Sequence, residues 1–353
     1  MAIANQFSAR TKSWATPNAA RVARFSFRRG GRTSDLQEAG VLLNRRESGL
    51  LRIKSLVATT GIALAATAGA GVASADVQPN LVGGHAATVA TPWMASLQYT
   101  APDYGITEPR HTCGGELIFA DTIVTNAHCV TDPPADVAKA GKNVLRFSTS
   151  DRKPVPTEAK RFIVRIGSHD RTQGGETATV THIEVNPGWA WGAPNAPKCK
   201  VQQPRLVNPI CDIAVLKLDH PVNSQTIQIA PRAAQPGDRV ELYGWGDNTP
   251  DPTPNLPTQL QQLTTKVVPP ARCTDAGQTP DEICTDNPNG TDGPGGGDSG
   301  GPAVKYVKGI PLLVGGCSRA ATQYPGVDET VYTSTPDFRS WIYDTARGAP
   351  VAA

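Results

Sequence analysis

The segment Gly295-Gly296-Gly297-Asp298-Ser299-Gly300-Gly301-Pro302 places one serine among five glycines. Because glycine tolerates tight backbone turns, such a serine can expose its hydroxyl group at the tip of a turn. The backbone N–H groups at and before the serine can then converge on one point, where they would stabilise a negatively charged oxygen. Taken alone, the segment is equally compatible with a flexible glycine-rich loop.

A histidine and an aspartate lie beside apolar runs elsewhere in the chain. His128 follows the run Val124-Thr125-Asn126-Ala127, and Asp212 precedes Ile213-Ala214-Val215-Leu216-Lys217-Leu218. A carboxylate at the edge of a buried strand needs a hydrogen-bonding partner, and an imidazole N–H is a suitable one. Each residue by itself also fits a purely structural role, as a buried histidine or as an aspartate that begins a strand.

Taken together, and in the order His128, Asp212, Ser299, the three segments resemble the catalytic motifs of the chymotrypsin/trypsin-like serine endopeptidases, peptidase family S1. In that family the motifs read approximately T-A-A-H-C, D-I-A-L-L and G-D-S-G-G-P. Further matches follow in the family's order at 81–84, 113–115, 164–167, 244–246, 331–333 and 341–342. The chain is therefore identified as a member of this family, and of its secreted bacterial type.

The resemblance implies an all-β fold of two six-stranded antiparallel β-barrels with a C-terminal helix and an active site between the barrels. It divides residues 81–353 into a first barrel over about 81–219 and a second over about 220–342. The composition agrees, because 34 glycines and 31 prolines favour short strands and turns over long helices. Apolar or alternating runs predict strands at 93–99, 116–126, 161–166, 177–185, 213–218, 239–243 and 312–317.

One helix is predicted near the C-terminus, where Thr335 can act as the cap and Pro336 suits the first turn. The apolar side chains that would share one face of this helix are Phe338, Trp341, Ile342 and Ala346. Two polar or proline-rich segments without a clear period, 131–160 and 187–209, are interpreted as inserted loops.

The resemblance also implies a role for each motif residue. Ser299 would attack the scissile carbonyl carbon, while His128 takes the serine proton and later donates it to the leaving amine. Asp212 would hold the imidazole in the required tautomer and stabilise its charged form. The N–H groups of Gly297 and Ser299 would bind the oxyanion. The histidines that lack this context, interpreted as surface or packing residues, are His85, His111, His169, His182 and His220.

Seven cysteines point to an oxidising compartment, and their odd number leaves at least one thiol without an intramolecular bridge. The family pattern implies two disulfides. Cys113 would pair with Cys129 beside the histidine, and Cys273 with Cys284 beside the specificity pocket.

The remaining cysteines depart from the family pattern. Cys199 and Cys211 flank the second inserted loop and could close it with a bridge, which leaves Cys317 over. The family usually has a cysteine four residues before the nucleophile, where this chain has Gly295. We therefore expect the walls of the pocket to be looser than in the family.

The family's spacing places the floor of the primary pocket six residues before the nucleophile, at Gly293. The walls would come from Ser318, Ala320 and Thr330. Because alanine and threonine replace two glycines, the pocket would be narrow, as in elastase-like members, and would prefer a small or medium apolar residue before the scissile bond (P1). The alternative is a trypsin-like preference for Arg or Lys, provided by the neighbouring Asp292.

The N-terminal part of the chain has the marks of a secretory signal. Basic residues precede the apolar run 56–72, and Ala73-Ser74-Ala75 fits a signal-peptidase site. The alternative, a membrane span, is disfavoured by the Ala, Gly and Thr content of the run and by the cleavage motif. We assign residues 1–75 to a leader and signal peptide and 76–80 to a short propeptide, and expect a secreted, extracellular protein.

Activation in this family depends on a new N-terminus at the position of Leu81. Its α-amino group turns inward and pairs with the carboxylate before the nucleophile, here Asp298, which directs the Gly297 N–H toward the oxyanion. Two residues depart from the usual pattern, because Leu81 replaces isoleucine and Asn80 is not a basic residue that a trypsin-like activator would cut after.

The composition argues against several other functions. The net charge is only +3, without a basic stripe, so nucleic acid is not an expected partner. The sequence has no clustered metal ligands such as H-E-x-x-H, and no metal or cofactor is expected. The expected partners are protein or peptide substrates and protein inhibitors, with no membrane after signal cleavage and a monomeric state. An inactive binding homologue is the alternative function class, which the intact motifs disfavour.

Overall fold

The computed structural model describes residues 81–133, 155–189, 191, 211–248, 256–322 and 326–348. The predicted leader, signal peptide and propeptide (1–80) lie outside these residues, as do most of both predicted inserted loops. Within the described part, no helix is long and apolar enough to cross a membrane.

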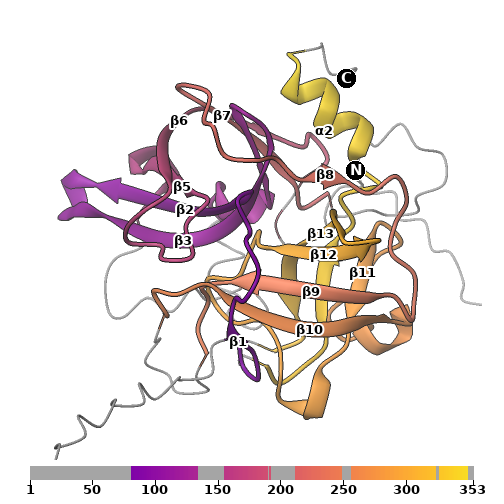
Figure 1. Cartoon of the computed structure of the whole chain (residues 1–353). Helices are drawn as coiled ribbons and strands as arrows, with labels where there is room; N and C mark the ends of the chain where they lie inside the picture. The colour runs from indigo at the N-terminus through magenta and orange to yellow at the C-terminus, as the bar shows by residue number, and fades with distance from the viewer. Residues whose placement is uncertain are drawn as a thin grey trace, which may run out of the picture. The chain divides into compact units, whose positions relative to one another are not determined.

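Six strands form the first closed barrel. In ring order they are β2 (Met94–Ala101), β3 (Ile106–Phe119), β4 (Thr122–Thr125), β7 (Ala214–Leu218), β6 (Glu176–Val185) and β5 (Arg161–Ile166), and every neighbouring pair is antiparallel (Figure 1). Strand β5 illustrates the alternation, because Phe162, Val164 and Ile166 are buried in the core while Arg161 is exposed.

A second ring of six antiparallel strands follows. In ring order it consists of β9 (Arg239–Gly244), β10 (Gln261–Val268), β11 (Glu282–Thr285), β14 (Thr330–Thr333), β13 (Ile310–Ala320) and β12 (Pro302–Val307), and β9 closes the ring by pairing with both β10 and β12. Two short strands extend the sheet: β1 (His85–Ala86) pairs with β10, and β8 (Gln228–Ile229) pairs in parallel with β13. The predicted fold of two six-stranded antiparallel barrels is therefore confirmed.

Short 3-10 turns connect several of these strands. They are η1 (Pro102–Tyr104), η2 (Ala127–Cys129), η3 (Thr157–Ala159), η4 (Pro270–Cys273) and η5 (Pro288–Gly290). The η2 turn carries His128 directly after β4, which positions the imidazole at the end of the first barrel.

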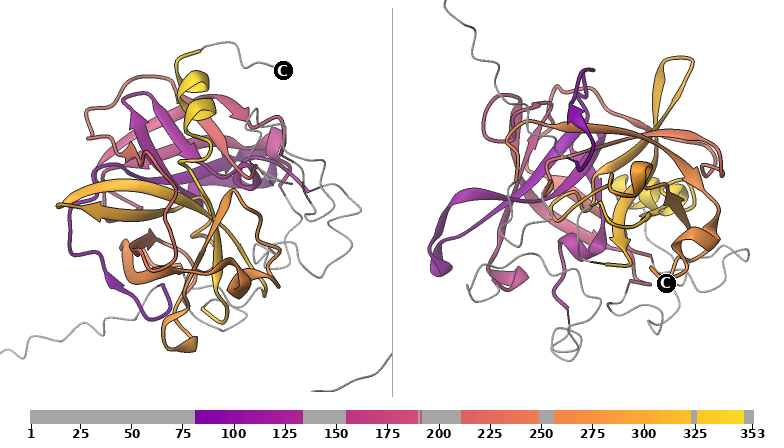
Figure 2. Two further views of the ribbon diagram at one scale, coloured as in Figure 1. Left: turned by 90° about the vertical axis from the view of Figure 1, so that its right-hand side faces the viewer. Right: turned by 90° about the horizontal axis from the view of Figure 1, so that it is seen from below.

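The C-terminal helix α2 (Arg339–Ala346) follows the last strand of the second barrel but packs on the first barrel (Figure 2). The rings of Phe119 and Tyr343 are 5.6 Å apart, and Lys217 donates a hydrogen bond from Nζ to the Ala346 carbonyl oxygen over 3.1 Å. The predicted apolar face is buried at Phe338, Ile342 and Ala346.

The predicted cap of this helix is wrong. The residue before the first helical turn is Phe338, and the helix has no side-chain cap. The hydroxyl of Thr335 donates instead to the Leu313 carbonyl oxygen of β13, and residues 335–338 form turns that end in the buried ring of Phe338. The buried Phe338 thus directly precedes the first helical residue, Arg339.

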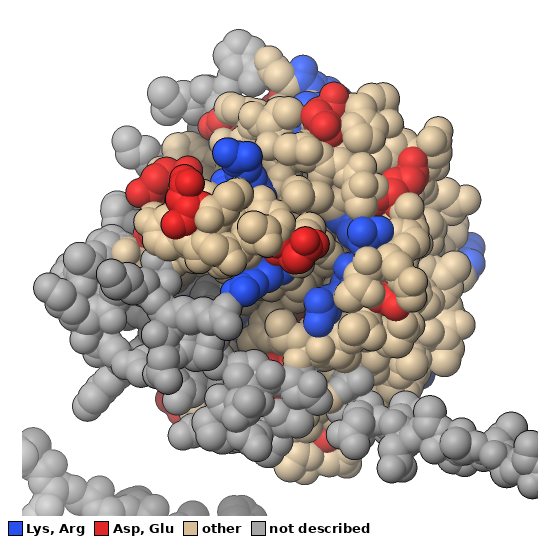
Figure 3. Space-filling model, turned by 90° about the vertical axis from the view of Figure 1, so that its left-hand side faces the viewer, with Lys and Arg blue, Asp and Glu red and all other residues tan. Residues whose placement is uncertain are grey.

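One apolar cluster fills the first barrel and extends into the contact with the second, which also has a separate apolar core of its own. Trp93 of the first barrel meets Tyr243 of the second edge to face, with ring centroids 5.7 Å apart, and Trp245 is fully buried in the same cluster. On the face shown in Figure 3, basic and acidic side chains lie interspersed rather than in separate fields, in keeping with the small net charge.

Candidate active site

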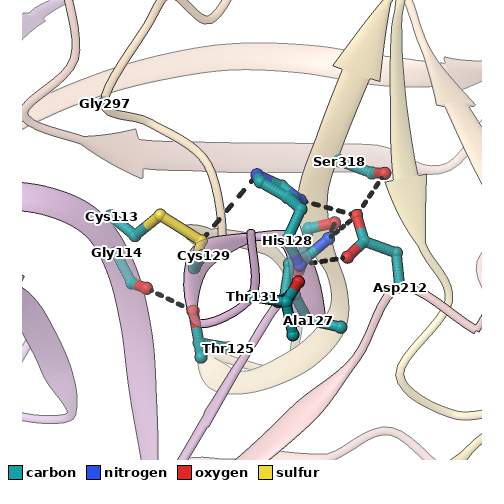
Figure 4. Close-up of a disulfide and its surroundings, with 12 residues drawn as sticks. Cys113, Gly114, Thr125, Ala127, His128, Cys129, Thr131, Asp212, Gly297 and Ser318 are labelled. Atoms are coloured by element: carbon teal, nitrogen blue, oxygen red, sulfur yellow. Dashed lines mark hydrogen bonds and ion pairs between the residues drawn. A yellow bond between two sulfur atoms is a disulfide. The ribbon is translucent and has the colours of Figure 1, made fainter. Parts of the chain in front are cut away.

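The geometry brings the predicted histidine and aspartate into direct contact. His128 Nδ1–H donates to Asp212 Oδ2 over 2.7 Å, and the backbone N–H of His128 donates to Asp212 Oδ1 over 2.9 Å (Figure 4). Both side chains are almost fully buried. These two bonds fix the ring in the tautomer that leaves Nε2 as the proton acceptor.

Two further side chains hold the aspartate. Ser318 Oγ–H and Asn126 Nδ2–H donate to Asp212 Oδ2 over 2.7 and 3.0 Å. Burial alone would raise the pKa of Asp212, but the charge and hydrogen bond of His128 and the hydroxyl of Ser318 lower it to about 2. Asp212 therefore stays ionised at neutral pH.

The predicted nucleophile is tied to the first barrel through the backbone. The N–H of Gly114 in β3 donates to the Ser299 carbonyl oxygen over 2.7 Å. Cys113, the residue before Gly114, forms a disulfide with Cys129, the residue after His128. Ser299 itself is buried, with an exposed fraction of 4%. The backbone thus joins the serine turn to the histidine turn across the barrels.

Gly297, one of the two predicted oxyanion residues, adopts a left-handed backbone conformation. Its φ angle is +103°, a conformation that favours glycine. No described residue accepts a hydrogen bond from the N–H of Gly297 or of Ser299. Both N–H groups are therefore available to a substrate oxygen within the described part of the chain.

His111 is a functional neighbour that the sequence reasoning missed. It is buried, its Nε2–H donates to the Gly297 carbonyl oxygen over 2.9 Å, and its Nδ1 accepts from Ser96 Oγ over 2.8 Å. Burial lowers the pKa of His111 to about 4, so the ring is neutral at pH 7 and holds the Gly297 carbonyl. The sequence feature that could have indicated this role is the position of His111 two residues before Cys113, in the segment that a disulfide joins to the histidine turn.

Asp298 and Leu81, the predicted activation pair, are both buried in the second barrel. The carboxylate of Asp298 accepts hydrogen bonds from the N–H of Gly246 (2.7 Å) and of Gly295 (2.9 Å). Burial raises the pKa of Asp298 to about 7, because no cation among the described residues offsets it. Leu81 lies beside the pocket floor, where the N–H of Gly293 donates to the Val82 carbonyl oxygen over 3.0 Å.

The predicted pocket residues converge. Ala320 and Thr330 are direct cross-strand partners on β13 and β14. A side chain at Gly293 would lie 3.9 Å from Thr330 Oγ1. The hydroxyl of Ser318 is turned toward Asp212.

Asp292 takes no part in this arrangement. Its carboxylate accepts hydrogen bonds from Asn289 Nδ2 and Thr291 Oγ1, over 2.6 and 2.9 Å. It also lies against Gly83, where any side chain would collide with it. Asp292 is thus engaged by the N-terminal segment and its own loop.

The disulfides follow the predicted pattern where the structure describes them. Cys273 pairs with Cys284, as Cys113 does with Cys129. Cys211 is disulfide-bonded, and Cys199 lies outside the described residues. Cys317 is a buried free thiol.

One described group of side chains has the spacing of a metal site. Potential ligand atoms of Cys113, His128 and Cys129 lie within 4.8 Å of one another. The two sulfur atoms are joined in a disulfide and cannot act as thiolate ligands.

Comparison with known proteins agrees with this geometry. The Trypsin family model matches residues 81–342, most of the chain. The chain belongs to the trypsin family. It is a serine-type endopeptidase, and so a hydrolase that acts on proteins.

The chain is similar to several trypsin-family proteins of animals. It is 28% identical over 310 residues to trypsin of Sarcophaga bullata (84% of this chain, 99% of the relative) and 27% identical over 307 residues to trypsin alpha of Drosophila melanogaster (84% and 99%). It is 28% identical over 283 residues to human kallikrein-14 (78% and 87%). These relatives give no support to the expected bacterial type.

Among solved structures, the chain matches neuropsin, a serine protease expressed in the limbic system of mouse brain. The TM-score is 0.49 at 23% identity, and the match covers 72% of this chain and 94% of that one.

Proposed function

We propose that this trypsin-family protein cleaves peptide bonds with Ser299 as nucleophile, His128 as general base and acid, and Asp212 as the residue that orients and stabilises the imidazole. The supporting observation is the 2.7 Å bond from His128 Nδ1 to Asp212 Oδ2, in a corner joined to Ser299 by the Gly114 backbone bond. The N–H groups of Gly297 and Ser299 would bind the oxyanion of each tetrahedral intermediate.

The reaction would proceed in two halves. Ser299 Oγ attacks the carbonyl carbon as His128 takes its proton, and the amine leaves with that proton to give an acyl-enzyme. Water then attacks the ester with the same imidazole as base, which releases the acid and restores Ser299.

A small or medium apolar P1 residue fits the proposed pocket best. Gly293 offers no charge at the floor, and the cross-strand pair Ala320 and Thr330 narrows the walls. The alternative, an Arg or Lys preference, would require Asp292 to leave Asn289 and Thr291. The relatives named trypsin keep this alternative open.

Secretion and activation at Leu81 belong to the same proposal. Asp298 is a buried carboxylate with no described cation beside it, and an α-amino group at Leu81 would supply one. A peptidase that cuts after Asn80 would be needed.

The test is to label the mature form, starting at Leu81, with an organophosphonate. Labelling of Ser299 together with loss of peptidase activity is expected, and Ser299→Ala should show neither. The Ser340→Ala variant is a matched control, because Ser340 is an exposed helix residue. Activity at the parent level in Ser299→Ala, with no labelling of the parent, would exclude Ser299 as the nucleophile.

A further inference from the structure

A chain of hydrogen bonds extends outward from Asp212 to a buried ion pair. Ser318 Oγ donates to Asp212 Oδ2 over 2.7 Å and accepts from Arg319 Nη1 over 3.2 Å. A guanidinium can only donate and a carboxylate can only accept, so the direction of the hydroxyl between them is fixed. The proton of Ser318 therefore points to Asp212.

The other side of the Arg319 guanidinium is held just as firmly. Nη1 and Nη2 donate to the two carboxylate oxygens of Glu282 in β11, over 2.5 and 2.8 Å. Nε and Nη2 also donate to the carbonyl oxygens of Ala276 and Gly277, each over 2.8 Å. The side chain of Arg319 is 18% exposed and that of Glu282 only 1%, so this fork-to-fork pair is shielded from solvent.

The neighbourhood of Arg319 is rich in acids. Asp212, Asp281 and Glu282 all interact with its charge. Burial and the neighbouring Glu282 raise the pKa of Asp281 to about 6. The thiol of Cys317 also interacts with the charge of Asp212, and burial raises the pKa of this thiol. Arg319 is the cation that these buried carboxylates share among the described residues.

We propose that Arg319 is a positioning residue of the peptidase reaction, which acts on Asp212 through Ser318 while Glu282 holds its guanidinium in place. This inference rests on the proposed triad and deepens it. Many members of the family have Ser-Trp-Gly at 318–320, and a tryptophan in place of Arg319 would bring one N–H donor and no positive charge. A donor chain of this kind polarises each member and strengthens the last bond, here the one to Asp212.

The same residue also holds the pocket wall. Gly295 stands where the family has a cysteine, and Arg319 supplies four hydrogen bonds from the wall strand β13 to β11 and the 276–277 loop. Where the family has a disulfide between the pocket walls, this chain therefore has hydrogen bonds from Arg319, which counteract the expected loosening of the walls.

Removing either charge of the ion pair between Arg319 and Glu282 should shift the pH dependence of kcat/KM, in opposite directions for the two residues. In Arg319→Met, loss of the positive charge favours a protonated imidazole at His128. The acid limb of the kcat/KM profile should therefore move to higher pH, by about half a unit, and kcat should fall about tenfold. In Glu282→Gln the guanidinium loses its counter-charge, so the acid limb should move to lower pH. Arg319→Lys keeps the charge but not the guanidinium hydrogen bonds. Compared with Arg319→Met, its acid limb should therefore lie close to that of the parent, while its kcat recovers less.

Arg272→Met is the matched control. Arg272 lies in η4 near the same loop, is 56% exposed, and pairs with Glu329 and Asp286 without reaching Ser318. The acid limb of the kcat/KM profile of Arg272→Met should match that of the parent protein. A merely structural role of Arg319 would lower the activity of Arg319→Met and Glu282→Gln without moving their limbs in opposite directions, and that result would overturn the inference.

Titration with the organophosphonate keeps this failure distinct from failure of the proposed function. If the parent and both variants label at Ser299 but share one pH profile, only the role of Arg319 is rejected. If the parent itself is not labelled, the proposed triad is rejected. If Arg319→Met does not fold, the other two variants still test the inference, because the acid limb should stay in place in Arg319→Lys and move to lower pH in Glu282→Gln.

Discussion

Gly114 donates its backbone N–H to the carbonyl oxygen of Ser299 over 2.7 Å, and this bond joins the two barrels beside the bonds from Ser318 to Asp212 and from His111 to Gly297. Gly114 follows a cysteine that is bridged to the neighbour of His128, so the serine turn and the histidine turn share one anchor. The relative placement of the His128 and Ser299 turns therefore depends in part on a backbone hydrogen bond.

Gly300 is a position where this anchor can be broken. Its φ angle is +73°, and a methyl group there would lie 2.6 Å from the Gly114 carbonyl oxygen and would collide with Thr125. Gly300→Ala should destabilise the fold by about 3 kcal/mol. Urea denaturation measures this, and Gly309→Ala, at a hairpin turn with open space, serves as the control for backbone strain alone. Equal losses in both variants would contradict the packing argument.

Asp212→Asn should leave the fold intact and lower kcat by about ten-thousandfold. An amide at this position can present its N–H to His128 Nδ1, which favours the tautomer that cannot accept the serine proton. Steady-state kinetics on one peptide gives the rate, and the melting temperature verifies folding. A loss of less than tenfold would argue against Asp212 as the orienting residue.

Profiling on a peptide library should show cleavage after Ala, Val or similar residues in preference to Arg or Phe. Differences of one or two methylene groups are worth about 1 to 3 kcal/mol, so the preference should be graded. Gly293→Asp should gain cleavage after Arg, whereas Asp292→Asn should leave the profile unchanged. If the parent protein prefers Arg or Lys, and the Asp292→Asn variant loses this preference, then Asp292 and not Gly293 determines the specificity.

The form that starts at Leu81 should be far more active than the form that starts at Asp76. Pairing with Asp298 would raise the pKa of the Leu81 α-amino group above its free value of about 8. The active conformer is then fully stabilised below the free value and lost as the pH rises through the raised one, which gives an alkaline limb in kcat/KM. Equal activity of the two forms, or full activity after acetylation of the Leu81 amine, would refute the pairing.

The unprocessed form should also lose stability as the pH rises. Burial raises the pKa of Asp298 from 3.8 to about 7, so the folded state holds a proton that the unfolded state releases. Its contribution is therefore lost between about pH 4 and 7, by at most about 4 kcal/mol. In the Ser299→Ala background, the melting temperature of the form starting at Asp76 should fall relative to the mature form between pH 5 and 8. Asp281 and Glu116, whose pKa values burial also raises, are present in both forms and cancel. A constant difference between the two forms would count against Asp298.

The sequence predicted those parts of the fold that local patterns encode. Alternation located β5 at its observed bounds, and the run 116–126 contains the end of β3 and all of β4. Strands β10, β11, β12 and β14 were not predicted from periodicity. In β10, for example, residues of both faces are buried, among them the neighbours Gln262 and Leu263. Burial on both faces removes the alternation on which the prediction depends.

The candidate site divides in the same way. Short motifs identified His128, Asp212 and Ser299 as candidate site residues, because the residues adjacent to each of them in the sequence match a motif of the family. Arg319 and Glu282 are 37 positions apart and carry no motif, so only the pairing of β11, β14 and β13 brings them together. Long-range polar pairs of this kind follow from the fold and cannot be found before it.

With the proposed secretion, the buried thiol of Cys317 would require the second barrel to close before this thiol is oxidised. In an oxidising compartment, an odd cysteine on a nascent chain competes for every partner until the second barrel closes over it. After closure the thiol is 5% exposed and protected from exchange. The yield of correctly bridged protein then depends on whether collapse of the second barrel outpaces oxidation, and Cys317→Val should make that yield insensitive to the redox buffer in refolding.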